Sequence, residues 1–192
     1  MNIGTARRMT AVGTTLAALV GCSPTPHPNQ IQNPSFESNT VGWQVVDNAP
    51  TYPPGEVPVL VRVSGAGAPD GKWAAEVIAR SNTATKIGIR DGAGDVHAAT
   101  TVTTYAYRAS MSCAVATTCG KFAYLFVEEL DASGNIVSES PAASVALTPT
   151  FQLLGGFMAP QHASDILRLN VLVTGVTRND AFYADNLLLG PA

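Results

Sequence analysis

The chain has 192 residues, of which 46% are hydrophobic and 13% charged, about half the charged fraction of an ordinary soluble domain. Its 17 glycines and 13 prolines disfavour helical bundles and coiled coils, and the high apolar fraction without a glycine period excludes collagen and disordered chains. A formal net charge of −3 without a Lys/Arg cluster argues against nucleic acid as a partner, because phosphate contacts need a basic surface.

Residues 1–21 have the pattern of an export signal. Arg7 and Arg8 form a basic start, and residues 9–20 are uncharged over a length typical of a signal peptide but too short to cross a bilayer. The following Leu19-Val20-Gly21-Cys22 resembles a bacterial lipoprotein signal, in which Cys22 is lipidated and begins the mature chain. The alternative is an ordinary secretory signal in which Cys22 has no role. We therefore expect either a cell-surface lipoprotein, attached to the membrane through its N-terminal lipid only, or an extracellular protein.

The remaining chain divides into a tether and one domain. Residues 22–32 contain three prolines at alternate positions, which predicts an extended, semi-rigid tether. Residues 33–192 are then long enough for one hydrophobic core. If Cys22 carries lipid, Cys113 and Cys119 remain as a pair in an oxidising compartment, which predicts a disulfide between them.

From residue 33 onward, alternating apolar and polar segments bounded by Gly, Pro, Asn and Asp predict strands rather than helices. The predicted strands are residues 43–46, 59–63, 73–79, 85–90, 102–113, 121–130, 135–140, 150–158, 166–174 and 182–189. The run Asp131-Ala132-Ser133-Gly134-Asn135 predicts a hairpin turn with Gly134 at positive φ. Many short strands at this spacing are typical of a β-sandwich or barrel.

Several motifs along the domain carry a resemblance to a known family. They are Asn33-Pro34-Ser35-Phe36-Glu37 with Gly42-Trp43, Ala68-Pro69-Asp70-Gly71-Lys72-Trp73-Ala74, Thr104-Tyr105-Ala106-Tyr107-Arg108-Ala109-Ser110, Glu129-Leu130-Asp131-Ala132-Ser133-Gly134-Asn135 and Phe182-Tyr183-Ala184-Asp185-Asn186-Leu187. In this order they resemble carbohydrate-binding modules of families four, nine and twenty-two, which have the galactose-binding-like jelly roll. The resemblance spans residues 33–189 and implies an all-β fold, a single jelly-roll β-sandwich that binds a polysaccharide or cell-surface glycan without catalysis. Because this fold hosts many functions, a structural or adhesion sandwich that binds a protein partner is the alternative, and a glycoside hydrolase is less favoured.

The resemblance also implies a structural calcium ion beside the chain ends, held by Glu37, the carbonyl of Lys72 and Asp185. Calcium takes six to eight hard oxygen ligands, which carboxylates and carbonyls supply. Asn186 stands where the family often has a second Asp, and this weakens the negative field. The alternative is that Glu37 and Asp185 are ordinary turn and strand-end carboxylates.

A disulfide between Cys113 and Cys119 predicts a hairpin in which Arg108 lies opposite Tyr124, with odd-numbered side chains in the core and even-numbered ones outside. The outer face would bind sugars, because aromatic rings stack on their C–H faces and charged or amide groups bond their hydroxyls. Its candidate binding residues are Arg108, Tyr124, Phe126, Glu128 and, from the strand 166–174, Asn170. The alternative is that a loop such as residues 91–100 covers the aromatic rings and Arg108 only stacks on Tyr124.

Other candidate residues give weaker signals. Trp43 and Trp73 are expected in the core, and Tyr52 on an exposed Pro-rich loop. Catalysis has little support, because the three His are scattered and no Ser-His-Asp or metal-ligand spacing occurs. Neighbouring Glu128 and Glu129 on one strand point to opposite faces, so they cannot form the carboxylate pair of a glycosidase. A pair assembled from distant residues, such as Asp95 with Glu128, remains open.

Overall fold

The computed structural model describes residues 29–92, 94 and 96–192, so the predicted export signal, Cys22, Asp95 and most of the predicted tether lie outside the described residues. The regular structure of the described part consists of strands and one short 3-10 helix. The elements are β1 (Trp43–Asp47), β2 (Val59–Ser64), β3 (Trp73–Ile78), β4 (Lys86–Asp91), β5 (Tyr105–Cys113), η1 (Ala116–Thr118), β6 (Phe122–Leu130), β7 (Ile136–Glu139), β8 (Ala143–Ala146), β9 (Gln152–Met158), β10 (Ile166–Thr174) and β11 (Ala181–Pro191). Within these residues no helix is long and apolar enough to span a membrane.

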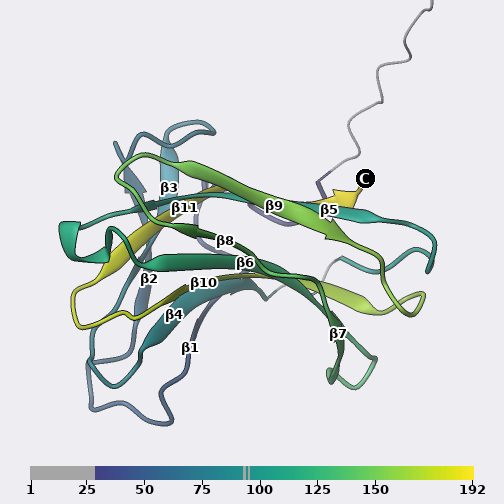
Figure 1. Cartoon of the computed structure of the whole chain (residues 1–192), viewed down its shortest axis with the longest axis horizontal. Helices are drawn as coiled ribbons and strands as arrows, with labels where there is room; N and C mark the ends of the chain where they lie inside the picture. The colour runs from purple at the N-terminus through teal and green to yellow at the C-terminus, as the bar shows by residue number, and fades with distance from the viewer. Residues whose placement is uncertain (1–28, 93, 95) are drawn as a thin grey trace, which may run out of the picture.

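The strands form two stacked sheets (Figure 1). Within each sheet, neighbouring strands are paired antiparallel. The six-stranded sheet has the order β1-β4-β10-β6-β7, with β8 also pairing with β6. The five-stranded sheet has the order β2-β3-β11-β5-β9. This two-layer arrangement confirms the predicted all-β jelly-roll sandwich.

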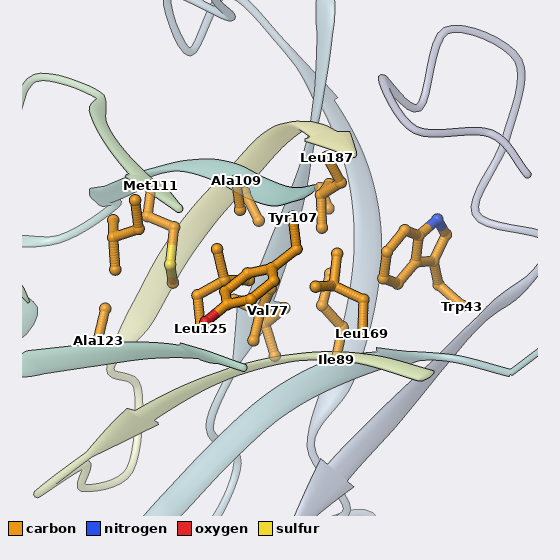
Figure 2. Packing of buried hydrophobic residues seen from close by; sticks show 14 of the residues in the cluster. Trp43, Val77, Ile89, Tyr107, Ala109, Met111, Ala123, Leu125, Leu169 and Leu187 are labelled. Atoms are coloured by element: carbon orange, nitrogen blue, oxygen red, sulfur yellow. The ribbon is translucent and has the colours of Figure 1, made fainter. Parts of the chain in front are cut away.

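Alternate apolar side chains from both sheets fill the space between the layers (Figure 2). Burying each large aliphatic side chain contributes about 1.5–3 kcal/mol, so the alternation decides which face of each strand points inward. Fully buried examples are Ile87 and Ile89 on β4, Ala109 and Met111 on β5, Leu125 and Val127 on β6, and Leu169 and Val171 on β10. The even-numbered residues of β4, β6 and β10 are left facing outward.

The predicted strands match the observed ones closely, and each of the ten overlaps an element of the sandwich. The hairpin between β6 and β7 is also confirmed, because Gly134 has φ 82° and the Asp131 carboxylate accepts the N–H groups of Ser133 and Asn135. Sequence reasoning missed β8, because Ala143–Ala146 has one β-branched residue in four and little strand preference.

Cys113 and Cys119 form the predicted disulfide, with their Cα atoms 5.1 Å apart. The strands that it joins do not form the predicted hairpin, however. β5 pairs with β11 and β9, whereas β6 pairs with β10, β7 and β8, and η1 lies in the connection between the two sheets. β5 and β6 face each other across the core, and each turns alternate side chains inward, as two strands of a hairpin would. The predicted alternation was therefore right, while the predicted pairing of the two strands was wrong.

Removing the disulfide tests its contribution to stability. The Cys113→Ser/Cys119→Ser double variant should lose about 2 kcal/mol of unfolding free energy, because the closed loop is short and restricts the unfolded chain only moderately. Urea unfolding under oxidising conditions measures this loss. Wild-type protein treated with a reductant should match the double variant, and an unchanged midpoint in both would contradict the expected contribution.

Two aromatic residues lie elsewhere than predicted. Trp43 is 7% exposed and packs against Phe36, as expected for a core residue. Trp73 is only half-buried, and the guanidinium of Arg62 lies 3.7 Å from its ring centroid. Tyr52 is half-buried against the core rather than exposed, and burial together with the Asp47 carboxylate raises its pKa to about 12.

Candidate functional site

The outer face of the six-stranded sheet contains a groove of about 480 Å³. Its floor is β10, which contributes Asn170, Leu172 and Thr174. One wall is β6, with the half-buried rings of Tyr124 and Phe126, and the other includes β4 and β1. Four of the five candidate binding residues therefore lie together: Tyr124, Phe126, Glu128 and Asn170.

Strand register fixes how these side chains face one another. Tyr124 is paired with Leu172 and Phe126 with Asn170, while Asn170 is paired on its other side with Arg90. Neighbouring strands lie about 4.8 Å apart, so the aromatic wall and the β4 wall are separated by about 10 Å across β10. The groove thus has an aromatic side and a cationic side over a mixed apolar and amide floor.

Glu128 closes one end of the groove and is held in place by an arginine. Its Oε2 accepts a hydrogen bond from Arg168 Nε at 2.8 Å and forms an ion pair with Nη2 at 2.7 Å, and the residue is 9% exposed. Glu139 on β7 lies directly opposite Glu128 in the register and also lines the groove. The neighbouring Glu129 points to the other face of β6, as its alternation with Glu128 predicted, and is fully buried.

Arg108 does not belong to this face, and its predicted contact with Tyr124 is wrong. It lies on β5 in the five-stranded sheet and points outward there, where Nη2 donates a hydrogen bond to Asn186 Oδ1 at 3.3 Å. The covering loop is also absent from this region, since no described residue of 91–100 lines the groove. Tyr124 and Phe126 are therefore open to the groove.

Sequence reasoning missed the cationic wall. Lys86 and Arg90 on β4 both line the groove. Their alternation with buried Ile87 and Ile89 is readable from the sequence and indicates outward side chains. It does not indicate that β4 lies one strand away from the aromatic residues, which depends on pairing between strands far apart in the chain.

A second polar cluster surrounds Asp185 on β11 and includes Glu37, from the first residues of the domain. Asp185 is fully buried; its Oδ2 accepts the Asp70 N–H at 2.9 Å, while Oδ1 has no hydrogen-bond partner of good geometry among the described residues. Glu37 Oε1 accepts the N–H groups of Lys72 at 2.8 Å and Trp73 at 2.9 Å. Asp70, which sequence reasoning did not include, therefore joins the predicted residues Glu37, Lys72 and Asp185.

The charges in this cluster suit a hard cation. Burial raises the pKa of Asp185 to about 6, and the negative charges of Asp70 and Glu37 add to this rise. A buried carboxylate oxygen without a partner, next to two further carboxylates, is costly unless a cation completes its surroundings. Carboxylate and carbonyl oxygens are the ligands that Ca²⁺ prefers, but the ligand atoms of Glu37, Asp70 and Asp185 do not form a group within 4.8 Å of one another among the described residues.

A third cluster brings together Glu129, His162 and Asp165, whose ligand atoms lie within 4.8 Å of one another. The Glu129 carboxylate already accepts hydrogen bonds from the Ser138 hydroxyl and from the N–H groups of Gln161 and His162. These bonds outweigh the effect of burial and hold the pKa of Glu129 below its ordinary value. Glu129 therefore anchors the segment before β10.

Comparison with known proteins finds solved structures with a similar fold. No protein-family description matches the sequence, and no curated protein matches it. Among solved structures, the CBM22-1 xylan-binding domain of Paenibacillus barcinonensis Xyn10C is similar with a TM-score of 0.57 and 18% identity, over 82% of this chain and 90% of that one.

Two further similar structures are described as enzymes. A cyclase from Fischerella sp. TAU has a TM-score of 0.60 and 12% identity, over 84% of this chain and 95% of that one. The enzymatically active domain of tailspike protein 4 from bacteriophage CBA120 has a TM-score of 0.64 and 13% identity over 85% of this chain, which spans only 21% of the tailspike chain. At these identities the likeness extends to the fold alone.

Proposed function

We propose that the protein is a non-catalytic carbohydrate-binding module that holds a polysaccharide in the groove of the six-stranded sheet. The observation that carries this proposal is the pair of aromatic rings, Tyr124 and Phe126, on successive outward positions beside an open trough. The sandwich fold shared with a xylan-binding domain supports it.

Each groove residue has a defined part in binding. The rings of Tyr124 and Phe126 stack on the C–H faces of successive sugars. Asn170 Nδ2 donates to the Arg168 carbonyl at 3.1 Å, which orients its amide oxygen to accept a sugar hydroxyl. Arg168 fixes Glu128 as a second acceptor. Binding is reversible, and no covalent step is involved.

Replacing Tyr124 with Ala tests the proposal. The variant should bind polysaccharide at least tenfold more weakly, roughly 1.4 kcal/mol, because an aromatic anchor at the centre of an interface carries a large share of the affinity. Its Tm should change little, because Tyr124 lies outside the core cluster. Affinity electrophoresis against xylan, galactan, mannan and polygalacturonate measures the binding.

The matched control is Phe157→Ala, which removes a 66% exposed ring from the five-stranded sheet. It should leave polysaccharide binding unchanged. Equal loss in both variants, or no binding of any polysaccharide by the wild type, would contradict the proposal. Products released from the same polysaccharides would instead indicate hydrolysis by the opposed carboxylates of Glu128 and Glu139.

Calcium and export are part of the same proposal. Glu37, Asp70, Asp185 and the Lys72 carbonyl would hold a structural Ca²⁺ that ties the start of the domain to β11. Export through residues 1–21, with lipid on Cys22 or with secretion, would place the module at the cell surface or outside the cell, where polysaccharides are accessible.

A protein partner is the second candidate function, and one observation favours it. Leu153 and Phe157 on β9 are 67% and 66% exposed on the outer face of the five-stranded sheet. Apolar patches of this kind often mark protein contacts. Loss of a partner interaction in Leu153→Ser/Phe157→Ser, with sugar binding absent in the wild type, would favour this function.

A further inference from the structure

Two cations line the groove, Lys86 and Arg90. The Lys86 ammonium and the Arg90 guanidinium both line the groove, and neither has a carboxylate within 4.0 Å among the described residues. Arg90 Nε instead donates to Gln44 Oε1 at 3.2 Å. Two partly buried positive charges therefore line the groove.

Among the described residues, no carboxylate of the groove forms an ion pair with Lys86 or Arg90 within 4.0 Å. Glu128 is paired with Arg168, and Asp47 Oδ1 accepts the Ala49 N–H at 2.8 Å. Glu139 lies on β7, three strands from β4 in the sheet order. β4 itself therefore contributes two positive charges and no negative charge to the groove, although the whole chain carries a formal charge of −3.

Lys86 and Arg90 are four positions apart on the same face of β4, so their Cα atoms are separated by about 13 Å. Gly88 lies between them, and a Cβ there would be 2.6 Å from the Leu172 side chain, so Leu172 packs over the strand at this point. Apolar surface thus separates the two cations and continues to the rings of Tyr124 and Phe126. The groove offers a sugar unit an aromatic side, an apolar floor and a cationic edge.

We infer that the groove selects an acidic polysaccharide whose sugar units carry carboxylates, that is, a uronic acid polymer. This inference rests on the proposed carbohydrate-binding function and specifies its ligand. A uronic acid presents C–H faces for stacking and a carboxylate at the ring edge. Ammonium and guanidinium groups form charge-assisted hydrogen bonds with such carboxylates.

The experiment compares polygalacturonate with its fully methyl-esterified form, which has the same backbone without the charge. Wild-type protein should bind the acid at least about tenfold more tightly at low ionic strength, and added salt should reduce this preference because it screens the exposed charges. Lys86→Gln and Arg90→Gln should each weaken binding of the acid about threefold or more and leave binding of the ester unchanged. Arg80→Gln removes one exposed charge outside the groove and should change neither.

The outcomes separate this inference from the proposed function. Equal binding of the acid and the ester, with both lost in Tyr124→Ala, would overturn the acidic ligand and leave carbohydrate binding in place. Absence of binding to every polysaccharide would overturn both. The Tm of Lys86→Gln and of Arg90→Gln is measured as a control. An unchanged Tm shows that a loss of affinity does not come from unfolding.

Discussion

In the absence of metal, Asp185→Asn should stabilise the protein by about 2–3 kcal/mol at pH 8. The folded-state pKa of Asp185 is raised to about 6, above the ordinary value near 3.8, because the carboxyl is buried close to Asp70 and Glu37. The folded protein thus binds this proton more tightly than the unfolded chain, and stability from this group is present at low pH and is lost as pH rises through about 6. A shift of two pKa units corresponds to about 3 kcal/mol.

At pH 8, calcium should largely remove the difference in stability between the two proteins. The wild type should gain roughly 3 kcal/mol, or about 5–10 °C in Tm, at a calcium concentration one hundred times the Kd. Asp185→Asn should lose this response, because the amide removes the charge at the oxygen without a partner. Thermal unfolding in a chelator, in Ca²⁺ and in Mg²⁺ between pH 4 and pH 8 measures both effects. A variant less stable than the wild type in chelator, or an equal response to calcium, would count against the ion site.

Asp180→Ala should have the opposite effect and destabilise the protein by about 3 kcal/mol at neutral pH. Asp180 is fully buried beside Lys121, whose Nζ lies 2.9 Å from Oδ2. Its carboxylate also accepts hydrogen bonds from the Thr118 hydroxyl and from the Thr177 N–H and hydroxyl. These groups join β11 to the η1 segment, and removing one member of a buried network leaves the others unpaired.

The pH dependence distinguishes this network from simple packing. Burial alone would raise the pKa of Asp180, but its hydrogen bonds and Lys121 lower it to about 2. The stabilising effect is therefore present above about pH 4 and is lost as pH falls through about 2, by about 2 kcal/mol. Urea unfolding from pH 2 to pH 7 should show this loss in the wild type and not in Asp180→Ala or Asp180→Asn. A parallel acid limb in all three proteins would show that Asp180 does not carry it.

The two aspartates show why their sequence neighbourhoods predict little about their charge states. Asp180 directly precedes β11, Asp185 lies within it five residues later, and both are fully buried. One meets Lys121 and threonine hydroxyl groups, whereas the other meets Asp70 and Glu37. The opposite pKa shifts depend in large part on partners that are distant in the chain, although Thr177, which also lowers the pKa of Asp180, is only three residues away.

The groove was predicted in its parts rather than as a whole. Alternation on the strands containing Tyr124 and Asn170 indicated outward side chains, and the observed pairing of β6 with β10 brings those residues together. The hairpin inferred from the disulfide placed Arg108 beside Tyr124, although β5 belongs to the other sheet. Lys86 and Arg90 were not included, because their strand is separated from β6 by β10.

The amino-acid sequence by itself determined the strand positions, the inward and outward faces and the cysteine pair, because these depend on side-chain alternation and on residues close together in the chain. Only the tertiary structure decided which strands are neighbours, and hence which charges and rings share a surface. Backbone hydrogen bonds between strands are nearly independent of side-chain identity, so a local pattern is compatible with several sheet orders. Packing of the whole core selects one of them.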